Sequence, residues 1–198
     1  MGQQPGKAAL FRPVAGMIFS LGFTGFFILM VWHWVLIAGV IKMPDAVKPH
    51  EVLKLLKEIS NAQTAYYQKS DQFLGQKQYA SFLPHLWITP DHQGRPIALD
   101  LVSKRIALAV GRETSLNGYF FVDVHLRYGP SRSHEVDYQR QWAIAAIPSD
   151  FGSSGAYVFL ADETGKIHAR HTDHQPDGFP LFPLKQGWVV VNDSFKLR

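Results

Sequence analysis

Cysteine is absent from all 198 residues of the chain. This absence excludes structural disulfides, zinc sites built from thiolates, iron–sulfur clusters and covalently attached c-type haem. Carboxylates are few and dispersed, so no acid–base pair can be nominated, and no phosphate-binding glycine loop is present. We therefore expect a protein that is not an enzyme.

Charged residues are missing from Val14 to Ile41, a run of 28 residues. At about 1.5 Å per residue, a helix of this length rises about 42 Å, which exceeds the roughly 30 Å of a hydrocarbon core. A secretory signal peptide has a shorter apolar stretch and a small-residue cleavage site. We expect an uncleaved transmembrane helix at residues 14–41, a leader at 1–13 and one domain at 42–198.

Small residues recur every four positions in this run, at Gly16, Ser20 and Thr24. They share one face of a helix, and such a face lets another helix approach closely. The sequence predicts an interface with integral membrane subunits here. The alternative is that small residues are simply common in membrane helices.

The formal net charge of +4 and the pI of about 9.3 suit anionic lipid headgroups or an acidic partner. The basic residues are scattered and do not form a run, so we expect no binding to nucleic acid. Lys7 and Arg12 precede the apolar run and four lysines follow it closely. Charge alone therefore does not set the orientation of the helix.

A second helix is predicted to begin at Pro49, since proline suits the first position of a helix. One face is apolar and the other is polar. The apolar face carries Val52, Leu55, Leu56, Ile59, Ala62 and Tyr66, and the polar face carries Lys54, Lys57, Glu58 and Asn61.

Strand patterns follow. The side chains of Tyr119 to Tyr128 alternate between two faces, which predicts one half-buried strand. Trp142 to Ile147 predicts a second strand, and residues 157–161 and 166–171 predict a hairpin. Residues 188–191 are expected to add an edge strand. The predicted fold is α+β, with an amphipathic helix packed on an antiparallel sheet.

Three segments resemble a bacterial group of type IV pilin-like and pseudopilin-like proteins. Asn61 to Tyr67 resembles the end of the helix in that group, and Gly118 to Phe120 resembles the start of a strand. The end of the pattern is matched by Ala146, Pro148, Gly152, Gly155, Phe159, Asp162, Gly165 and Ile167. The resemblance implies a bacterial inner-membrane protein with a pilin-like domain in the periplasm. We expect the matching residues to determine the fold rather than to act in catalysis.

The membrane run departs from this family. Gly22-Phe23-Thr24 is similar to the segment that a prepilin peptidase cleaves, but Phe27 stands where the assembly glutamate is expected. A filament-forming pilin is therefore disfavoured. A pseudopilin of a secretion or filament system remains an alternative.

His33 is the one ionisable residue of the membrane run, and Trp32 and Trp34 flank it. A neutral imidazole can ligate a haem iron or a bacteriochlorophyll magnesium. Leu10 to Pro13, followed by His33, resembles the light-harvesting α polypeptides of purple bacteria, although Leu29 replaces their usual alanine. The alternative is a histidine at the membrane interface without a cofactor, and we expect no cofactor elsewhere.

His168, His171 and His174 are spaced by three residues, with Asp173 beside the last. On a strand this spacing sends His168 and His171 to opposite faces, so one metal ion cannot bind both. We expect no metal site.

Four aromatic residues lie in or next to proline-rich segments: Trp87, Phe179, Phe182 and Trp188. Aromatic side chains on such segments often anchor interfaces. The alternative is that they cap the core of the sheet.

Together these patterns predict a non-catalytic, single-pass subunit that braces or docks a larger membrane protein complex. A photosynthetic reaction-centre and light-harvesting assembly is the specific complex that the membrane run suggests. A pigment- or haem-binding anchor at His33 is the second hypothesis.

Overall fold

The structure is a computed structural model, and it describes residues 49–191. These residues belong to the second of two units into which the chain divides, residues 1–43 and 44–198. Within residues 49–191, no helix is long and apolar enough to cross a membrane. The predicted helix at 14–41 lies outside the described residues, together with Gly16, Ser20, Thr24 and His33.

Helix α2 spans Pro49–Leu74, and it begins where the sequence predicts. Its apolar side chains recur every three or four residues, and Val52 and Ile59 are fully buried. The helix ends because Gly75 has a φ of 75° and donates its N–H to the carbonyl of Asp71 at 3.1 Å.

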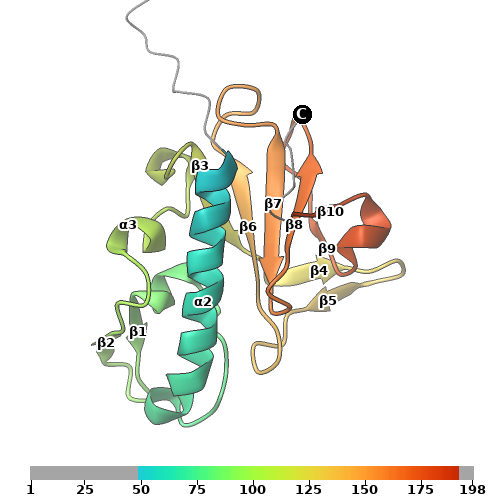
Figure 1. Ribbon diagram of the computed structural model, residues 1–198. Helices are drawn as coiled ribbons and strands as arrows, with labels where there is room; N and C mark the ends of the chain where they lie inside the picture. The colour runs from blue at the N-terminus through green and yellow to red at the C-terminus, as the bar shows by residue number, and fades with distance from the viewer. Residues whose placement is uncertain (1–48, 192–198) are drawn as a thin grey trace, which may run out of the picture. The chain divides into compact units, whose positions relative to one another are not determined.

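A lobe of short elements lies beside α2 (Figure 1). Gln63 and Tyr66 tie α2 to this lobe. The Gln63 side chain hydrogen-bonds the backbone of Ala80, and the Tyr66 hydroxyl lies 3.1 Å from Oγ1 of Thr89. The elements are η1 Leu83–Leu86, β1 Ile88–Pro90, β2 Pro96–Ala98, α3 Lys104–Ala107 and η2 Arg112–Thr114.

The main sheet has five strands in the order β10-β8-β7-β6-β3, and every neighbouring pair is antiparallel. The second predicted strand and the predicted hairpin agree with β6, β7 and β8 to within one residue. The predicted edge strand at 188–191 contains β10. The strands are β3 Tyr119–Asp123, β6 Ala143–Pro148, β7 Tyr157–Asp162, β8 Ile167–His171 and β10 Val189–Val190.

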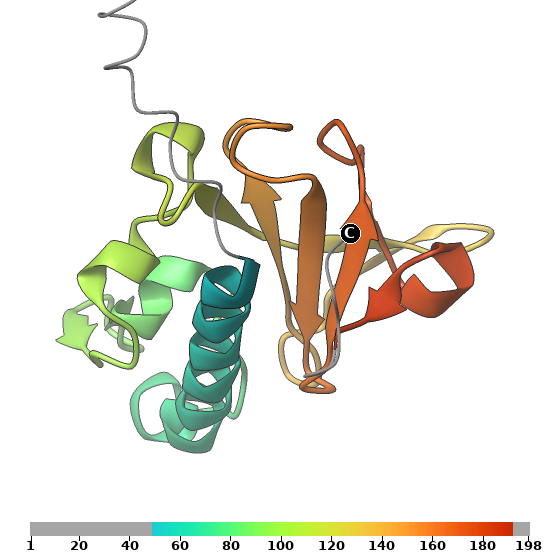
Figure 2. The same ribbon diagram turned by 45° about the horizontal axis from the view of Figure 1, so that its top comes forward.

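Both faces of this sheet are buried. Phe121 and Phe159 pack in the cluster that contains the apolar face of α2. On the opposite face, Leu160 packs with Phe179 and Trp188. Figures 1 and 2 show α2 on one side of the sheet and β9 with its following helical turn on the other.

The predicted strand over residues 119–128 is wrong as a single element. Residues 119–123 form β3 of the main sheet, whereas β4 (Leu126–Tyr128) pairs with β5 (Ser133–Glu135) and β9 (Phe179–Pro180) in a separate sheet. The chain leaves the main sheet at Val124, whose N–H still bonds the carbonyl of Ala143 at 3.0 Å. The alternating pattern continues through the break, so the sequence does not reveal it.

The coarse fold class is confirmed: the domain is α+β, with one main helix and antiparallel sheets. One pairing differs, because β9 runs parallel to β4. This pairing brings the segment after β9 against the outer face of the main sheet, where it forms one wall of a cavity.

Candidate functional site

A buried arginine lies where the two larger sheets meet. Arg127 on β4 is only 3% exposed, and its Nη2 lies 3.2 Å from Oδ2 of the equally buried Asp162 at the end of β7. Arg127 also donates to the carbonyl of Pro180 at 3.2 Å and to that of Leu181 at 3.4 Å. The guanidinium therefore joins three chain segments, and the carboxylate compensates its charge.

The Asp162 carboxylate is held by the turn that follows it. Its Oδ1 accepts from the N–H of Thr164 at 3.1 Å and from the Thr164 hydroxyl at 2.6 Å. Gly165 closes the turn with a φ of 72° and donates its N–H to the Asp162 carbonyl at 3.0 Å. The second oxygen, Oδ2, is thereby aimed at Arg127.

Two buried polar atoms near this pair have no hydrogen-bond partner among residues 49–191. Oε2 of Glu163 lies 3.7 Å from Nη1 of Arg127 without bonding it, and burial raises the pKa of Glu163. Nδ1 of His168 has no partner, and this side chain is only 5% exposed. Burial lowers the pKa of His168, so its imidazole is neutral at pH 7.

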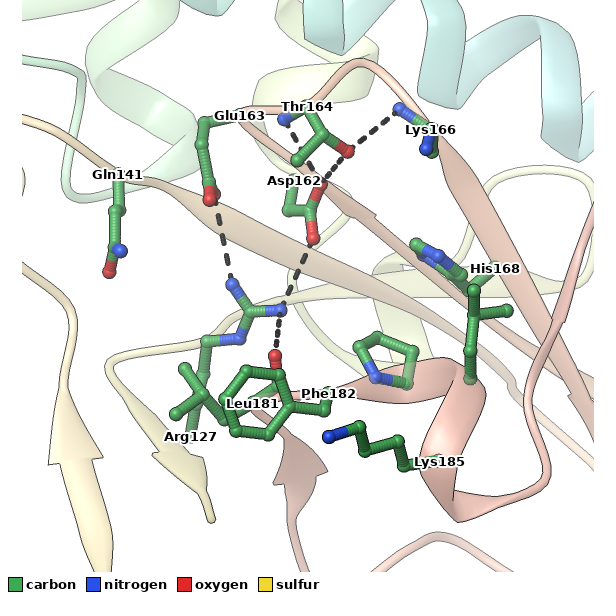
Figure 3. Close-up of a pocket in the computed structure, with 12 residues that line it drawn as sticks. Arg127, Gln141, Asp162, Glu163, Thr164, Lys166, His168, Leu181, Phe182 and Lys185 are labelled. Carbon is green, nitrogen blue, oxygen red and sulfur yellow. Dashed lines mark hydrogen bonds and ion pairs between the residues drawn. The ribbon is translucent and has the colours of Figure 1, made fainter.

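These groups line a cavity of about 400 Å³. The opposite wall is the chain from Leu181 into helix η3 (Pro183–Gln186). Phe182 and Leu184 on this wall are 46% and 61% exposed. Figure 3 shows Arg127 between the carboxylates of Asp162 and Glu163 and the backbone of Leu181.

Two lysines complete the lining of the cavity. Lys166 and Lys185 are exposed, and Nζ of Lys185 lies 5.2 Å from the centroid of the Phe182 ring. Within residues 49–191, neither lysine forms an ion pair. The cavity thus combines an apolar wall with two lysines that form no ion pair in the described part of the chain.

The structure separates the four aromatic residues that the sequence singles out. Phe179 and Trp188 are 7% and 2% exposed and pack together in the core, with ring centroids 6.5 Å apart. Trp87 is half-buried, and Nζ of Lys104 lies 5.3 Å from its ring. Only Phe182 belongs to the cavity wall.

The three histidines do not meet. His168 lines the cavity. His171 is exposed and packs edge-on against Tyr157, with the two ring centroids 5.2 Å apart. His174 bonds the carboxylate of its neighbour Asp173 at 2.6 Å. In the part of the chain that the structure describes, no three His, Cys, Asp or Glu side chains are placed to hold a metal ion.

Sequence reasoning missed Arg127, Glu163 and Leu184 as members of this site. Arg127 follows the alternation of residues 119–128 and reads as part of a solvated face. Its burial depends on the parallel pairing of β4 with β9, which joins residues about 50 positions apart. No local pattern encodes that pairing.

Comparisons with known proteins found no matching family model, no similar curated protein and no similar solved structure.

Proposed function

We propose that this chain is a non-catalytic, single-pass membrane subunit whose pilin-like domain docks a larger membrane protein complex. The anchor is residues 14–41, and the domain lies in the periplasm of a bacterial cell. The docking site is the surface around the cavity, hereafter the η3 surface, formed by Phe182, Leu184, Lys166 and Lys185.

The observation that supports this proposal most strongly is the exposure of the cavity wall that runs from Leu181 into helix η3. Among residues 49–191, Leu184 is the most exposed of the large apolar side chains, at 61%, and Phe182 on the same wall is 46% exposed. Apolar side chains that border a cavity together mark interaction sites more often than isolated ones do. The segment is also held firmly, because Arg127 bonds its backbone.

Support for the pilin-like assignment comes from the residues that carry the resemblance. Tyr66 on α2 and Phe159 on β7 are buried in the same core cluster, and Gly152 and Gly165 adopt positive φ. A Cβ on Gly155 would overlap the Tyr119 hydroxyl. Each therefore acts on the fold, as the resemblance implies.

Co-purification tests the proposal. The full chain, extracted from its own membranes in mild detergent, should bring integral membrane subunits with it. Replacing both Phe182 and Leu184 by Ser should reduce the recovered partner severalfold. The matched control replaces Leu108 and Val110 by Ser. Both residues follow α3, are 43% and 45% exposed and lie outside the cavity lining, so recovery should be unchanged. Equal loss in both variants would refute docking through the η3 surface.

The photosynthetic assembly is the first complex to test, because the resemblance to light-harvesting polypeptides falls on the proposed anchor. An absorption spectrum of the wild-type complex and of His33→Ala separates a docking subunit from a cofactor-binding one. Loss of a red-region or Soret band in the variant would favour the pigment- or haem-binding anchor.

A further inference from the structure

We propose that the η3 surface receives an acidic segment of the partner, which inserts an apolar side chain into the cavity and places carboxylates against Lys166 and Lys185. This inference rests on the proposed function and names the chemistry of the partner.

The charged side chains of the cavity lining predict the charge of the partner segment. Three cations and two carboxylates line the cavity, but both carboxylates face Arg127, at 3.2 Å for Asp162 and 3.7 Å for Glu163. Lys166 and Lys185 form no ion pair among residues 49–191, and three cations against two carboxylates give the lining a formal net charge of +1. Complementary charge at the rim of an interface guides association and suppresses wrong partners.

The cavity can accommodate an apolar side chain of the partner segment. Its volume of about 400 Å³ lies beside Phe182 and Leu184, so an inserted apolar side chain would cover surface that now meets water.

Exposure of the wall favours a polypeptide over a free small molecule. Small ligands are usually enclosed over most of their surface. Here Phe182 and Leu184 are 46% and 61% exposed, so an occupant must extend beyond the cavity to cover them. A segment of a larger protein does so, and a free small anion is an outcome of the test.

Photo-cross-linking in native membranes tests the inference. The full chain carries p-benzoylphenylalanine in place of Leu184, and the cross-linked partner peptide is sequenced. We expect a peptide with Asp or Glu flanking an apolar residue. We also expect Lys166→Glu combined with Lys185→Glu to lower the yield by roughly three- to tenfold. The control, Lys69→Glu combined with Lys77→Glu, makes the same charge change at exposed lysines outside the cavity lining.

The outcomes separate the inference from the proposed function. Two results would refute the inference that the docked segment is acidic: a cross-linked peptide without acidic residues, or an equal loss of yield in both double variants. Neither result would refute docking itself. If no peptide is captured and extracted membrane lipids or metabolites block cross-linking at position 184, the occupant is a free anion and not a polypeptide segment. The inference then fails. If the chain is also a monomer, the proposed function fails with it.

Discussion

The side-chain amide of Gln63 forms two hydrogen bonds with one residue, Ala80. Its Nε2 donates to the Ala80 carbonyl and its Oε1 accepts from the Ala80 N–H, each at 3.0 Å. Gln63 is 3% exposed and Ala80 is 2% exposed, so water cannot replace either bond. This pair fixes the chain after α2, and it gives a structural role to a residue in the motif that resembles pilin-like proteins.

Replacing Gln63 by Met should destabilise the domain by about 2–4 kcal/mol, because both polar groups of Ala80 would remain buried without partners. Gln68 lies on the exposed face of the same helix, so Gln68→Met is the matched control and should change stability little. Urea unfolding of the full chain, followed by tryptophan fluorescence, measures both. Similar midpoints for the two variants would contradict the role assigned to Gln63.

Arg127→Leu should lower the free energy of unfolding by about 3–5 kcal/mol, because it leaves the buried carboxylate of Asp162 without a countercharge. Adding Asp162→Asn should recover part of this loss, since the neutral amide needs no countercharge. The control Arg140→Leu removes an arginine whose side chain is 85% exposed and should have little effect. Additive losses in the double variant would show that Arg127 and Asp162 are not coupled.

Gly155→Ala should destabilise the domain by about 1–3 kcal/mol, because the new methyl group overlaps the Tyr119 hydroxyl. Tyr119→Phe removes that hydroxyl, so it should rescue part of the loss in the double variant. Gly111→Ala is the control: the nearest atom would lie 3.7 Å from its Cβ. Thermal unfolding of the four variants decides whether the overlap is the cause.

The contribution of Asp123 to the stability of the domain should fall as the pH rises from about 4 to about 6. Both carboxylate oxygens accept from the N–H of Leu83, at 3.0 and 3.1 Å, yet burial raises the pKa of Asp123 from 3.8 to about 6. In this window the Asp123 carboxyl keeps a proton in the native state that it has lost in the unfolded chain, so its contribution to the free energy of unfolding decreases with pH. The change is at most about 3 kcal/mol.

Asp123→Asn isolates this contribution, because the amide keeps an acceptor for Leu83 and does not titrate. The difference in unfolding free energy between wild type and variant should change between pH 4 and 6 and be flat above pH 7. Burial, with a further contribution from Asp123, raises the pKa of Tyr138 to about 12, so Tyr138 stays neutral across this range. A difference that is constant from pH 4 to 8 would show that Asp123 titrates normally.

The elements that the sequence predicts well are those whose residue pattern and boundaries are set within one segment of the chain. The amphipathic spacing from Pro49 and the hairpin before His171 both appear where expected. The cavity could not be predicted, since it depends on β4 leaving the main sheet and pairing with β9 about 50 residues later. Phe179 and Trp188 illustrate the same limit. Both are aromatic residues of the kind that often anchor interfaces, but the fold buries them together in the core.

Native mass spectrometry of the full chain, extracted from its own membranes, tests the central claim most directly. The proposed docking subunit should appear in a particle with integral membrane proteins at fixed stoichiometry, and the chain that dissociates from it should retain the residues before Gly22. A monomer free of partners would contradict the claim. A shortened chain that begins after Gly22 would instead favour a processed pseudopilin.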